Sequence, residues 1–552
     1  MPRHPCAAAR ALALLLSLSL GSSLCFAAPR DHADRVETAD IPMRDGTELL
    51  TDLYFPKAPG PYAILLHRTP YGRGLVGGVA AEAERFLDAG YVVAIQNLRS
   101  GAGTKPTVAI FLPDGWGQLQ DGYDTVEWLA QQDWSTGSIG TYGASGPGIT
   151  QYLLAGTGHP ALKAQHIGLA TPDLYAHACL QGGVLRKSLA EQWLKLVANN
   201  WALFEGMLAE HRAYDDLWKG TNLLEVPQQS HAAALHWGGW YDIFNQGTID
   251  AFVALQHRGG EGARGRQRLI MGPWPHGIAN RHGDVEFPRN ALLPRHMDTY
   301  EWFNHYLRGE DTGIEEWPPV AYYVMGDLSD PNAPGNEWRE VPDWPPPARP
   351  TPLYLREGGL LSWDEPAAEQ PDAYDYDPRD PVPTHGGGNL FLPKGCFDQR
   401  QVEDRDDVLL YTTEPLEEPL EVTGRILVKL WASSDCVDTD FTAKLTDVYP
   451  DGRSLLVLDG ILRARFRDTS EQERFLLPGK PYLFTIDLWS TSLIVNRGHR
   501  LRLAISSSNY PRFDANPNNG KSKREEGDPK VAHNTIYHDR DRPSHLLLPI
   551  PR

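Results

Sequence analysis

The segment Ser138-Ile-Gly-Thr-Tyr-Gly-Ala-Ser-Gly-Pro-Gly-Ile-Thr-Gln151 decides the fold that the sequence predicts. Its first part, up to Tyr142, contains strand-forming residues, and a helical pattern begins at Ile149. Ser145 lies between them, among glycines. A serine on such a sharp strand-to-helix turn is typical of a nucleophile elbow. Its small neighbours let the strand and the helix approach closely, and the helix N-terminus favours a developing oxyanion.

The elbow departs from the plain G-x-S-x-G pattern. Pro147 stands where the second glycine is usual, and Gly148 follows it. A glycine-rich turn that merely contains a serine is therefore an alternative interpretation of this segment, and the choice depends on the rest of the chain.

On both sides of the elbow, apolar runs of strand length alternate with helical segments, which indicates an α/β fold with a doubly wound, mostly parallel sheet. Strands are expected at 36–40, 48–54, 62–67, 91–96, 164–169, 232–237 and 267–271, and helices at 80–89, 122–131 and 298–307.

Two other regions have a different character. From 171 to about 230 strand patterns are rare, and helices rich in Trp, Leu and Ala are expected at 185–199 and 201–216, which indicates a helical cap over the site. A proline-dense linker at 342–352 precedes short alternating runs typical of a β-sandwich or jelly roll. The predicted domains are a catalytic α/β-hydrolase domain at 28–170 and 231–345, a cap at 171–230 and a jelly roll at 346–552.

The first 27 residues predict a secretory signal peptide. A basic start at Arg3 and Arg10 precedes a short apolar run at 11–20, and Cys25-Phe-Ala27 provides a small-x-small cleavage pattern. The sequence therefore predicts a bacterial protein that is secreted or periplasmic. An uncleaved anchor is the alternative.

Composition narrows the partners and the cofactors. The net charge of −19 over 552 residues argues against nucleic acid or an anionic membrane as a partner. No segment after the signal could span a membrane, and no Cys/His cluster has zinc-binding spacing. Of the three cysteines outside the signal, Cys396 and Cys436 could form one disulfide bond, while Cys179 has no evident role. Assembly into a homo-oligomer stays open.

A serine hydrolase also needs a base and an acid, and two segments provide them. The segment Leu235-His-Trp-Gly-Gly-Trp-Tyr-Asp242 follows a predicted strand and ends in a carboxylate. The segment Leu269-Ile-Met-Gly-Pro-Trp-Pro-His276 follows the next strand and ends in a histidine. Taken singly, each is an ordinary loop residue. The chain order Ser145, Asp242, His276 is the order found in α/β-hydrolases, which favours a catalytic triad.

Several further segments resemble one family over nearly the whole mature chain. They are Asp121-Gly-Tyr-Asp-Thr-Val-Glu-Trp128, the elbow, Gly239-Trp-Tyr-Asp242, Gly272-Pro-Trp-Pro-His276, Trp302-Phe-Asn-His-Tyr-Leu-Arg-Gly309, Asp438-Thr-Asp-Phe441, Gly498-His-Arg500 and Ser506-Ser-Ser-Asn-Tyr-Pro-Arg-Phe513. Together they resemble the bacterial acyl-esterase and acylase family of the CocE/NonD type. This family includes cocaine esterase, α-amino acid ester hydrolases, glutaryl-cephalosporin acylases and X-Pro dipeptidyl peptidases.

The resemblance implies the three-part architecture, the triad of Ser145, Asp242 and His276, and acyl transfer without a metal or an organic cofactor. It also implies an oxyanion hole made by the hydroxyl of Tyr71 and the backbone N–H of Gly146. The family usually has tyrosine at the position of Gly146, so we expect a larger acyl pocket here.

A second departure concerns Asn97 and Ser100, which stand where the family commonly has aspartate and glycine. The family's substrate specificity can therefore not be carried over to this chain.

The sequence thus predicts a secreted serine hydrolase that cleaves an ester or amide bond of a small molecule. Dipeptidyl-peptidase or α-amino acid ester hydrolase activity is an alternative, and it requires carboxylates that bind a substrate ammonium group. A catalytically decayed protein that binds ligands through its jelly roll is the non-enzymatic alternative. The candidate carboxylates are Asp173, Glu191, Glu205, Asp284 and Glu286.

Overall fold

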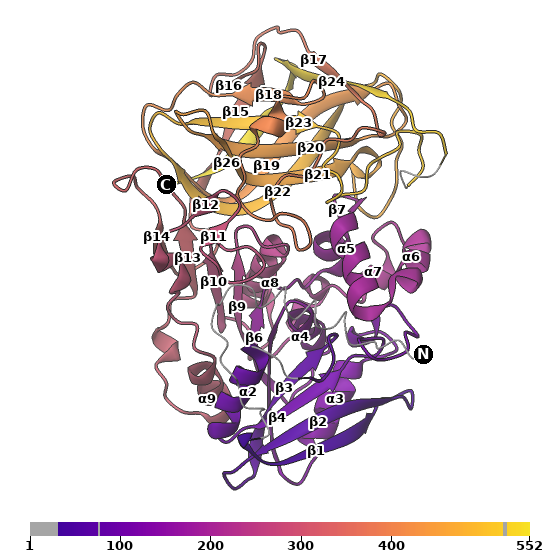
Figure 1. Cartoon of the computed structure of the whole chain (residues 1–552), viewed down its shortest axis with the longest axis vertical. Coiled ribbons are helices and arrows are strands. Elements are labelled where there is room, and N and C mark those ends of the chain that lie inside the picture. Colours follow the sequence, from indigo (N-terminus) through magenta and orange to yellow (C-terminus); the bar gives the residue numbers. More distant parts are fainter. Residues whose placement is uncertain (1–30, 75–77, 523–526) are drawn as a thin grey trace, which may run out of the picture.

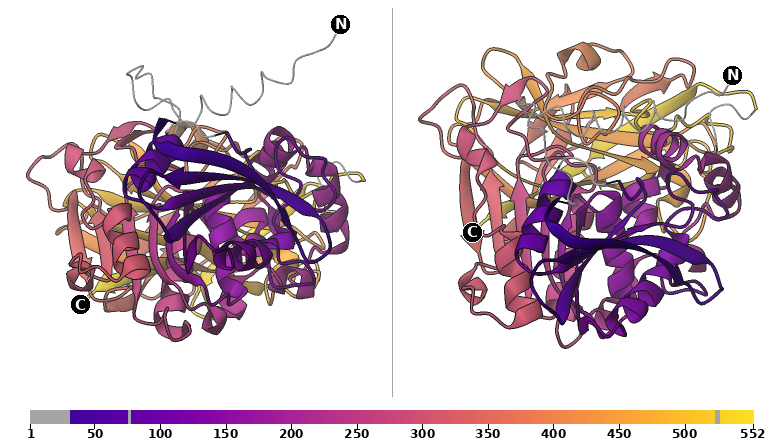
Figure 2. Two further views of the ribbon diagram at one scale, coloured as in Figure 1. Left: turned by 90° about the horizontal axis from the view of Figure 1, so that it is seen from below. Right: turned by 60° about the horizontal axis from the view of Figure 1, so that its bottom comes forward.

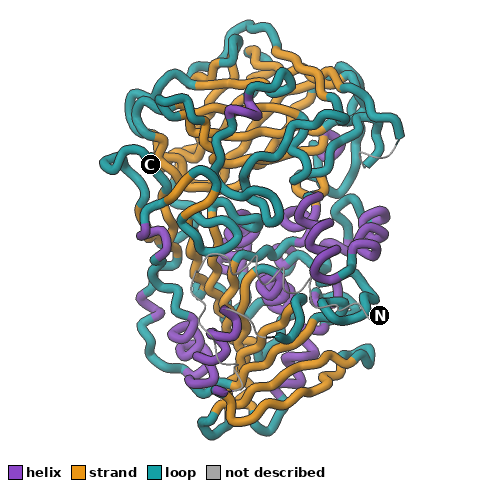
Figure 3. The backbone as a smooth tube through the Cα atoms, viewed as in Figure 1, coloured by secondary structure: helices purple, strands orange, loops and turns teal. Residues whose placement is uncertain are grey.

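The computed structural model describes residues 31–74, 78–522 and 527–552, and its chain forms two lobes (Figure 1). One lobe contains the N-terminal α/β part and nearly all of the helices, and the other consists of strands and long loops (Figure 3). The expected signal peptide at 1–27 lies outside the described residues.

A ten-stranded sheet forms the centre of the α/β lobe. The strands from β4 to β13 in the spatial order run parallel to one another, and β1, β2 and β14 pair antiparallel at the two edges. This arrangement confirms the doubly wound, mostly parallel sheet. In spatial order the strands are β1 (Ala33–Pro42), β2 (Glu48–Pro56), β4 (Val92–Asn97), β3 (Tyr62–Thr69), β5 (Ser135–Ala144), β6 (Leu162–Gly168), β9 (Ala233–Gly239), β10 (Gln267–Gly272), β13 (Val320–Val324) and β14 (Glu337–Val341).

Helices cover both faces of this sheet, because its strands are apolar on both sides. Along β3, Leu65 belongs to a core cluster with α2 and α9, whereas Ile64 and Leu66 belong to a cluster with α3 on the other face. Successive side chains of a strand point to opposite faces, so one apolar run builds both cores. Figure 2 shows this lobe from below, with its first strands in front. The helices are α2 (Gly78–Asp88), α3 (Asp121–Ala130), α4 (Gly146–Gly156), α8 (Asn245–Arg258) and α9 (Thr299–Arg308).

The segment between β6 and β9 is helical, but its helices are shorter than expected. The helix expected at 185–199 is α5 (Lys187–Trp193) followed by a π-helical turn, η4 (Leu194–Ala198), which ends at Asn199 in the left-handed region. The helix expected at 201–216 is α6 (Trp201–Glu210). Asp215 then accepts a hydrogen bond from the N–H of Leu217 and begins a new helix, α7 (Asp216–Lys219).

The remainder of this segment consists of short elements. They are a π-helical turn, η3 (Leu174–Cys179), the hairpin β7 (Leu180–Gln181) and β8 (Val184–Leu185), and the 3-10 turns η5 (Leu223–Glu225) and η6 (Pro227–Gln229). Among the described residues, no helix is both long enough and apolar enough to span a membrane.

The C-terminal lobe is a mainly antiparallel β domain that confirms the predicted all-β architecture. Its strands are β15 (Ala348–Arg356), β16 (Leu360–Ser362), β17 (Asp372–Tyr376), β18 (Leu409–Thr412), β19 (Leu420–Ser434), β20 (Asp440–Val448), β21 (Ser454–Arg463), β22 (Tyr482–Val495), β23 (Arg500–Ser506), β24 (Ala532–Asp539), β25 (Arg542–Pro543) and β26 (His545–Pro551), with one short helix, α10 (Arg400–Glu403). The hairpin β11 (Arg281–His282) and β12 (Val285–Glu286) lies between the lobes (Figure 1).

The segment 342–352, expected as a linker, is partly a strand. From Ala348 onward it forms β15, which pairs with β26. The prolines at 350 and 352 are tolerated because β16 pairs with β15 only from Tyr354 onward, so one side of the strand lacks a neighbour along 348–353.

The cysteines outside the signal are free thiols. Cys396 and Cys436 are buried and unbridged, and Cys179 is also free, so the disulfide bond left open by the sequence is not formed.

Candidate active site

Ser145 occupies the sharp turn between β5 and α4, with φ of 64° and ψ of −126°. A non-glycine residue in such a backbone conformation costs about 1–3 kcal/mol, and strain of this kind is concentrated at functional sites. The glycines around it are needed for space. A Cβ atom at Gly148 would lie 2.6 Å from Cβ of Ala170, and one at Gly143, where φ is +138°, would lie 2.6 Å from Cβ of Pro147. The turn therefore presents a serine hydroxyl on a rigid, tightly packed backbone.

The hydroxyl of Ser145 begins a chain of hydrogen bonds through two buried side chains. Its Oγ lies 2.9 Å from Nε2 of His276, and Nδ1 of His276 lies 2.6 Å from Oδ1 of Asp242. The other carboxylate oxygen of Asp242 accepts a hydrogen bond of 3.1 Å from the N–H of Phe244. Because a carboxylate only accepts, Nδ1 carries the proton and Nε2 is left to accept one from the serine. Parallel strands place the three residues together, since each follows the carboxyl end of its strand: β5, β9 and β10.

The residues expected to bind an oxyanion also lie beside Ser145. The hydroxyl oxygen of Tyr71 is 3.4 Å from Oγ of Ser145. The N–H of Gly146 belongs to the first turn of α4, where backbone amides have no acceptor within the helix. A Cβ atom at Gly146 would lie 2.7 Å from Cγ of Pro70 and 3.1 Å from the Tyr71 hydroxyl. A side chain at position 146 therefore crowds Pro70 and the Tyr71 hydroxyl.

A cavity adjoins Ser145 and Gly146, and its volume is about 690 Å³ when the solvent-filled space at its mouth is included. Its lining is strongly apolar, and the helical insertion contributes much of it. The large side chains that line it include Phe111, Trp193, Phe204, Met207, Trp218 and Phe244. No sequence motif identified any of these residues. The sequence feature related to them was the Trp- and Leu-rich composition of the insertion, which contributes much of the apolar wall. Composition alone does not identify the individual residues that form this wall.

Phe111 and Trp193 form a stacked aromatic pair in this wall. Their rings stack with centroids 5.6 Å apart and an interplanar angle of 20°, and Trp193 also makes an edge contact with Tyr71. Phe111 has φ of 71°, a strained conformation for a bulky residue. An aromatic pair thus joins the loop before α3, the insertion and Tyr71.

The loop that carries Phe111 is held by Ser100, one of the two residues that depart from the family pattern. Its Oγ accepts hydrogen bonds from the N–H groups of Thr107 (3.0 Å) and Val108 (3.3 Å). The other, Asn97, has a buried side-chain oxygen that finds no hydrogen-bond partner among the described residues.

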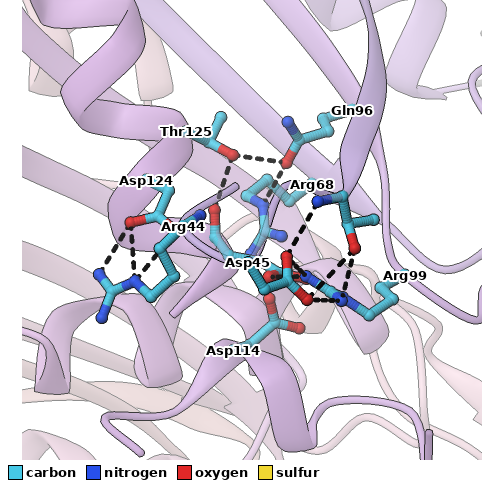
Figure 4. A network of polar contacts seen from close by, with 10 residues as sticks. Arg44, Asp45, Arg68, Gln96, Arg99, Asp114, Asp124 and Thr125 are labelled. Carbon is cyan, nitrogen blue, oxygen red and sulfur yellow. Dashed lines mark hydrogen bonds and ion pairs between the residues drawn. The ribbon is translucent and has the colours of Figure 1, made fainter. Parts of the chain in front are cut away.

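A polar network ties the same loop to the sheet (Figure 4). Arg68 of β3 forms a buried ion pair of 2.5 Å with Asp114, and Arg99 binds Asp121 at 2.8 Å and Asp45 at 2.6 Å. These contacts position the loop between β4 and α3 and thereby one wall of the cavity.

The carboxylates considered for ammonium binding do not line the cavity. Asp173 is buried, where it accepts hydrogen bonds from the N–H of Ala176 and from Asn222, and burial raises its pKa to about 6. Glu191 forms ion pairs with Lys187 of its own helix and with Lys195 of the turn that follows it, and Asp284 accepts a hydrogen bond from the N–H of Asp398. Glu205 and Glu286 do not line the cavity either, and none of the described residues that line it is acidic. Burial also raises the pKa of the Cys179 thiol in this wall to about 12, so it stays neutral.

Comparisons with known families match both lobes. The model of the X-Pro dipeptidyl-peptidase (S15 family) matches residues 45–206 and 198–278, which include Ser145, Asp242 and His276. The model of the X-Pro dipeptidyl-peptidase C-terminal non-catalytic domain matches residues 312–547.

Individual proteins match over nearly the full chain. Cocaine esterase from Rhodococcus sp. (strain MB1 Bresler) is 34% identical, over 92% of this chain and 97% of its own. The structure of an aminopeptidase from a marine sediment Thaumarchaeota archaeon has a TM-score of 0.78 at 25% identity and covers 97% of this chain and 99% of its own. That of an α-amino acid ester hydrolase has a TM-score of 0.77 at 26% identity and covers 96% and 100%.

Proposed function

The chain belongs to the CocE/NonD and X-Pro dipeptidyl-peptidase S15 family of serine hydrolases, and we propose that it hydrolyses neutral esters with a large apolar acyl group, using Ser145, His276 and Asp242. The observation that carries the proposal is the hydrogen-bonded chain from Ser145 to Asp242 at the edge of an apolar cavity that lacks acidic residues in its described lining.

In the first step, Oγ of Ser145 attacks the ester carbonyl carbon while Nε2 of His276 takes its proton. Asp242, which accepts from Nδ1, holds the imidazole in the required tautomer and stabilises the imidazolium that forms. The carbonyl oxygen becomes an oxyanion, to which the hydroxyl of Tyr71 and the N–H of Gly146 donate. Each such donor typically contributes about 3 kcal/mol to the transition state. The imidazolium then protonates the leaving alkoxide, and an acyl-enzyme remains.

In the second step, water attacks the carbonyl carbon of the acyl-enzyme. His276 removes a proton from this water through the same nitrogen, and the same two donors hold the oxyanion. Collapse of the intermediate releases the carboxylic acid and returns the proton to Ser145, which restores the starting state.

The character of the cavity supports a neutral apolar acyl group. Aromatic and aliphatic side chains such as Phe111, Trp193 and Phe204 surround it. An ammonium group placed among them would lose its hydration without gaining a carboxylate partner, which costs several kcal/mol. An aminopeptidase and an α-amino acid ester hydrolase share this fold, but the carboxylates that an amino substrate requires are missing from the described lining.

The test compares two substrates that differ only in the ammonium group. These are 4-nitrophenyl phenylacetate and its α-amino analogue, assayed at pH 6, where the amine is charged. We expect kcat/KM to favour the phenylacetate by at least about 100-fold, which corresponds to ~2.7 kcal/mol. Fluorophosphonate labelling, with mapping of the labelled peptide to Ser145, identifies the nucleophile. Equal kcat/KM values would contradict the neutral-ester proposal, and absence of label on Ser145 would contradict the triad.

We further propose that residues 1–27 direct export. The basic start and the short apolar run support this proposal. N-terminal sequencing of the protein purified from its native bacterium checks it: a mature N-terminus near Ala28 is expected, and an intact Met1 on the functional protein would contradict it.

A further inference from the structure

The loop that carries Asp242 contacts the C-terminal β domain on both sides of the carboxylate. Before it, the hydroxyl of Tyr241 donates a hydrogen bond of 3.0 Å to the carbonyl of Leu456 in β21. After it, the side-chain amide of Asn245 donates one of 2.8 Å to the carbonyl of Ser490 in β22. The hydroxyl of Ser490 in turn donates one of 2.8 Å to Oε1 of Gln246. All of these side chains are buried.

Asn245 also closes the loop on itself. The same side-chain nitrogen that reaches Ser490 donates a hydrogen bond of 3.0 Å to the carbonyl of Trp240, the residue two before Asp242. The backbone N–H of Asn245 donates to the carbonyl of Asp242 at 3.3 Å. The backbone from Trp240 to Asn245, which contains Asp242, therefore forms a short closed loop. The Asn245 side chain that closes this loop is also hydrogen-bonded to the β domain.

The β domain is irregular where it makes this contact. The pairing of β22 with β19 shifts register between Ile426 and Leu427, which face Trp489 and Asp487. Trp489 has φ of 72°, and its N–H is held by Oδ1 of Asp487 at 2.9 Å. A β-bulge re-aims the residues that follow it, and here the next residue is Ser490. A strained conformation at a bulky residue persists only where the surrounding structure enforces it.

We propose that Ser490 of the C-terminal β domain is a positioning residue for the triad: its hydroxyl, through Gln246, holds the 240–246 loop, which Asn245 also ties to the Ser490 carbonyl, so that Asp242 stays aligned with Nδ1 of His276. This proposal rests on the proposed function of Ser145, His276 and Asp242. It assigns a role in catalysis to the C-terminal β domain, which belongs to a family of domains named as non-catalytic. The alignment matters because the carboxylate acts on the transition state, where the imidazolium forms, so a small misplacement lowers the rate rather than substrate binding.

The experiment uses two serines of the same strand in the full-length protein. Ser490→Ala removes the hydroxyl that reaches Gln246. Ser492→Ala is the matched control, because Ser492 is equally buried and its hydroxyl binds Thr423 within the β domain at 2.9 Å. With 4-nitrophenyl phenylacetate, we expect Ser490→Ala to lower kcat by about 10-fold with KM unchanged, and Ser492→Ala to keep kcat within about 2-fold. Both variants should melt at similar temperatures.

A second variant tests the proposal even if the Ser490→Ala protein fails to fold. Gln246→Ala removes the other partner of the same hydrogen bond, and it should also lower kcat without raising KM. If the two side chains act as one unit, the double variant Ser490→Ala/Gln246→Ala should be no slower than the slower single variant. Equal kcat values for Ser490→Ala and Ser492→Ala, or additive losses in the double variant, would overturn the positioning role.

Fluorophosphonate titration of Ser145 is run on each protein to separate this inference from the proposed function. If wild type is labelled at Ser145 and Ser490→Ala keeps wild-type kcat, the positioning role alone fails. If wild type is not labelled there, the proposed triad fails first, and the positioning role is rejected with it.

Discussion

Oδ1 of Asp242 lies 2.6 Å from Nδ1 of His276, and neither side chain is appreciably exposed to solvent, with exposed fractions of 0% and 2%. An acceptor at this place allows only one neutral tautomer, the one in which Nε2 faces Ser145 without a proton. In the proposed mechanism, Asp242 therefore acts on Ser145 through the orientation and charge of the imidazole between them.

Replacing Asp242 by asparagine should therefore lower kcat by about 10⁴-fold, because an amide NH₂ at that place favours the wrong tautomer. Ser145→Ala and His276→Ala should reduce ester hydrolysis at least as strongly and leave the fold intact. The measurement is kcat with a 4-nitrophenyl ester, with circular dichroism as a check on folding. Asp173→Asn is the control, since this buried carboxylate caps a turn and does not contact the triad; a comparable loss there would contradict the assignment.

Tyr71→Phe should lower kcat by roughly 10²- to 10³-fold with little change in KM, because its hydroxyl acts on the oxyanion of the transition state. Steady-state kinetics with one ester measures both constants. Tyr175→Phe serves as the control, because its hydroxyl binds the carbonyl of Arg212 within the insertion. If Tyr71→Phe behaves like that control, the second oxyanion donor lies elsewhere.

Gly146→Ala should lower kcat, because the added methyl group approaches Pro70 to 2.7 Å and the Tyr71 hydroxyl to 3.1 Å. Gly146→Tyr should do so more strongly and should also favour short acyl esters over bulky aromatic ones, since Gly146 lines the cavity. The comparison is kcat/KM for an acetate and a benzoate ester. Gly206→Ala, where a methyl group meets no described atom within 4 Å apart from those of its chain neighbours and its own helix backbone, should leave both values unchanged. An unaltered ratio in Gly146→Tyr would show that this position does not limit acyl size.

His499 should stabilise the protein in a pH-dependent way. Its Nδ1 lies 2.9 Å from Asp447 of the β domain, and its Nε2 lies 3.3 Å from Asp327, which follows β13 of the α/β lobe. Burial alone would lower the pKa of His499, but the hydrogen bond to Asp447 and the charges of both carboxylates outweigh it and raise the pKa above 6.5. The neighbouring Tyr449 and Arg453 add a ring and a further charge at this junction.

A group whose pKa is raised by folding contributes stability that is present in full below its unfolded value of 6.5 and is lost as the pH rises through the folded value. His499→Asn should therefore lower the melting temperature more at pH 6 than at pH 9. Thermal unfolding of wild type and variant at both pH values measures this difference. A gap that stays constant, or widens toward pH 9, would show that the imidazolium does not bridge the two lobes.

Much of the site was predictable from short stretches of sequence. The strand, the glycines and the helix around Ser145 are adjacent in the chain, so their sequence pattern predicts the local backbone conformation directly. Asp242 and His276 could be selected because each lies a few residues after a predicted strand, and parallel strands bring their carboxyl ends to one edge of the sheet. The same local patterns did not detect the breaks near Asn199 and Asp215, which depend on single residues that end one helix and begin the next.

Only the tertiary structure decided which residues far apart in the chain contact one another. Phe111 stacks on Trp193, and Ser490 meets Gln246 across 244 positions. The sequence named five acidic residues but not their distance from Ser145, and that distance determines whether the cavity accepts an ammonium group. Hydrophobic periodicity records which face of a strand or helix is buried, not against which partner. The partners are chosen by the packing of whole elements, and in this protein that packing sets the apolar lining of the cavity and the contacts of the 240–246 loop with the β domain.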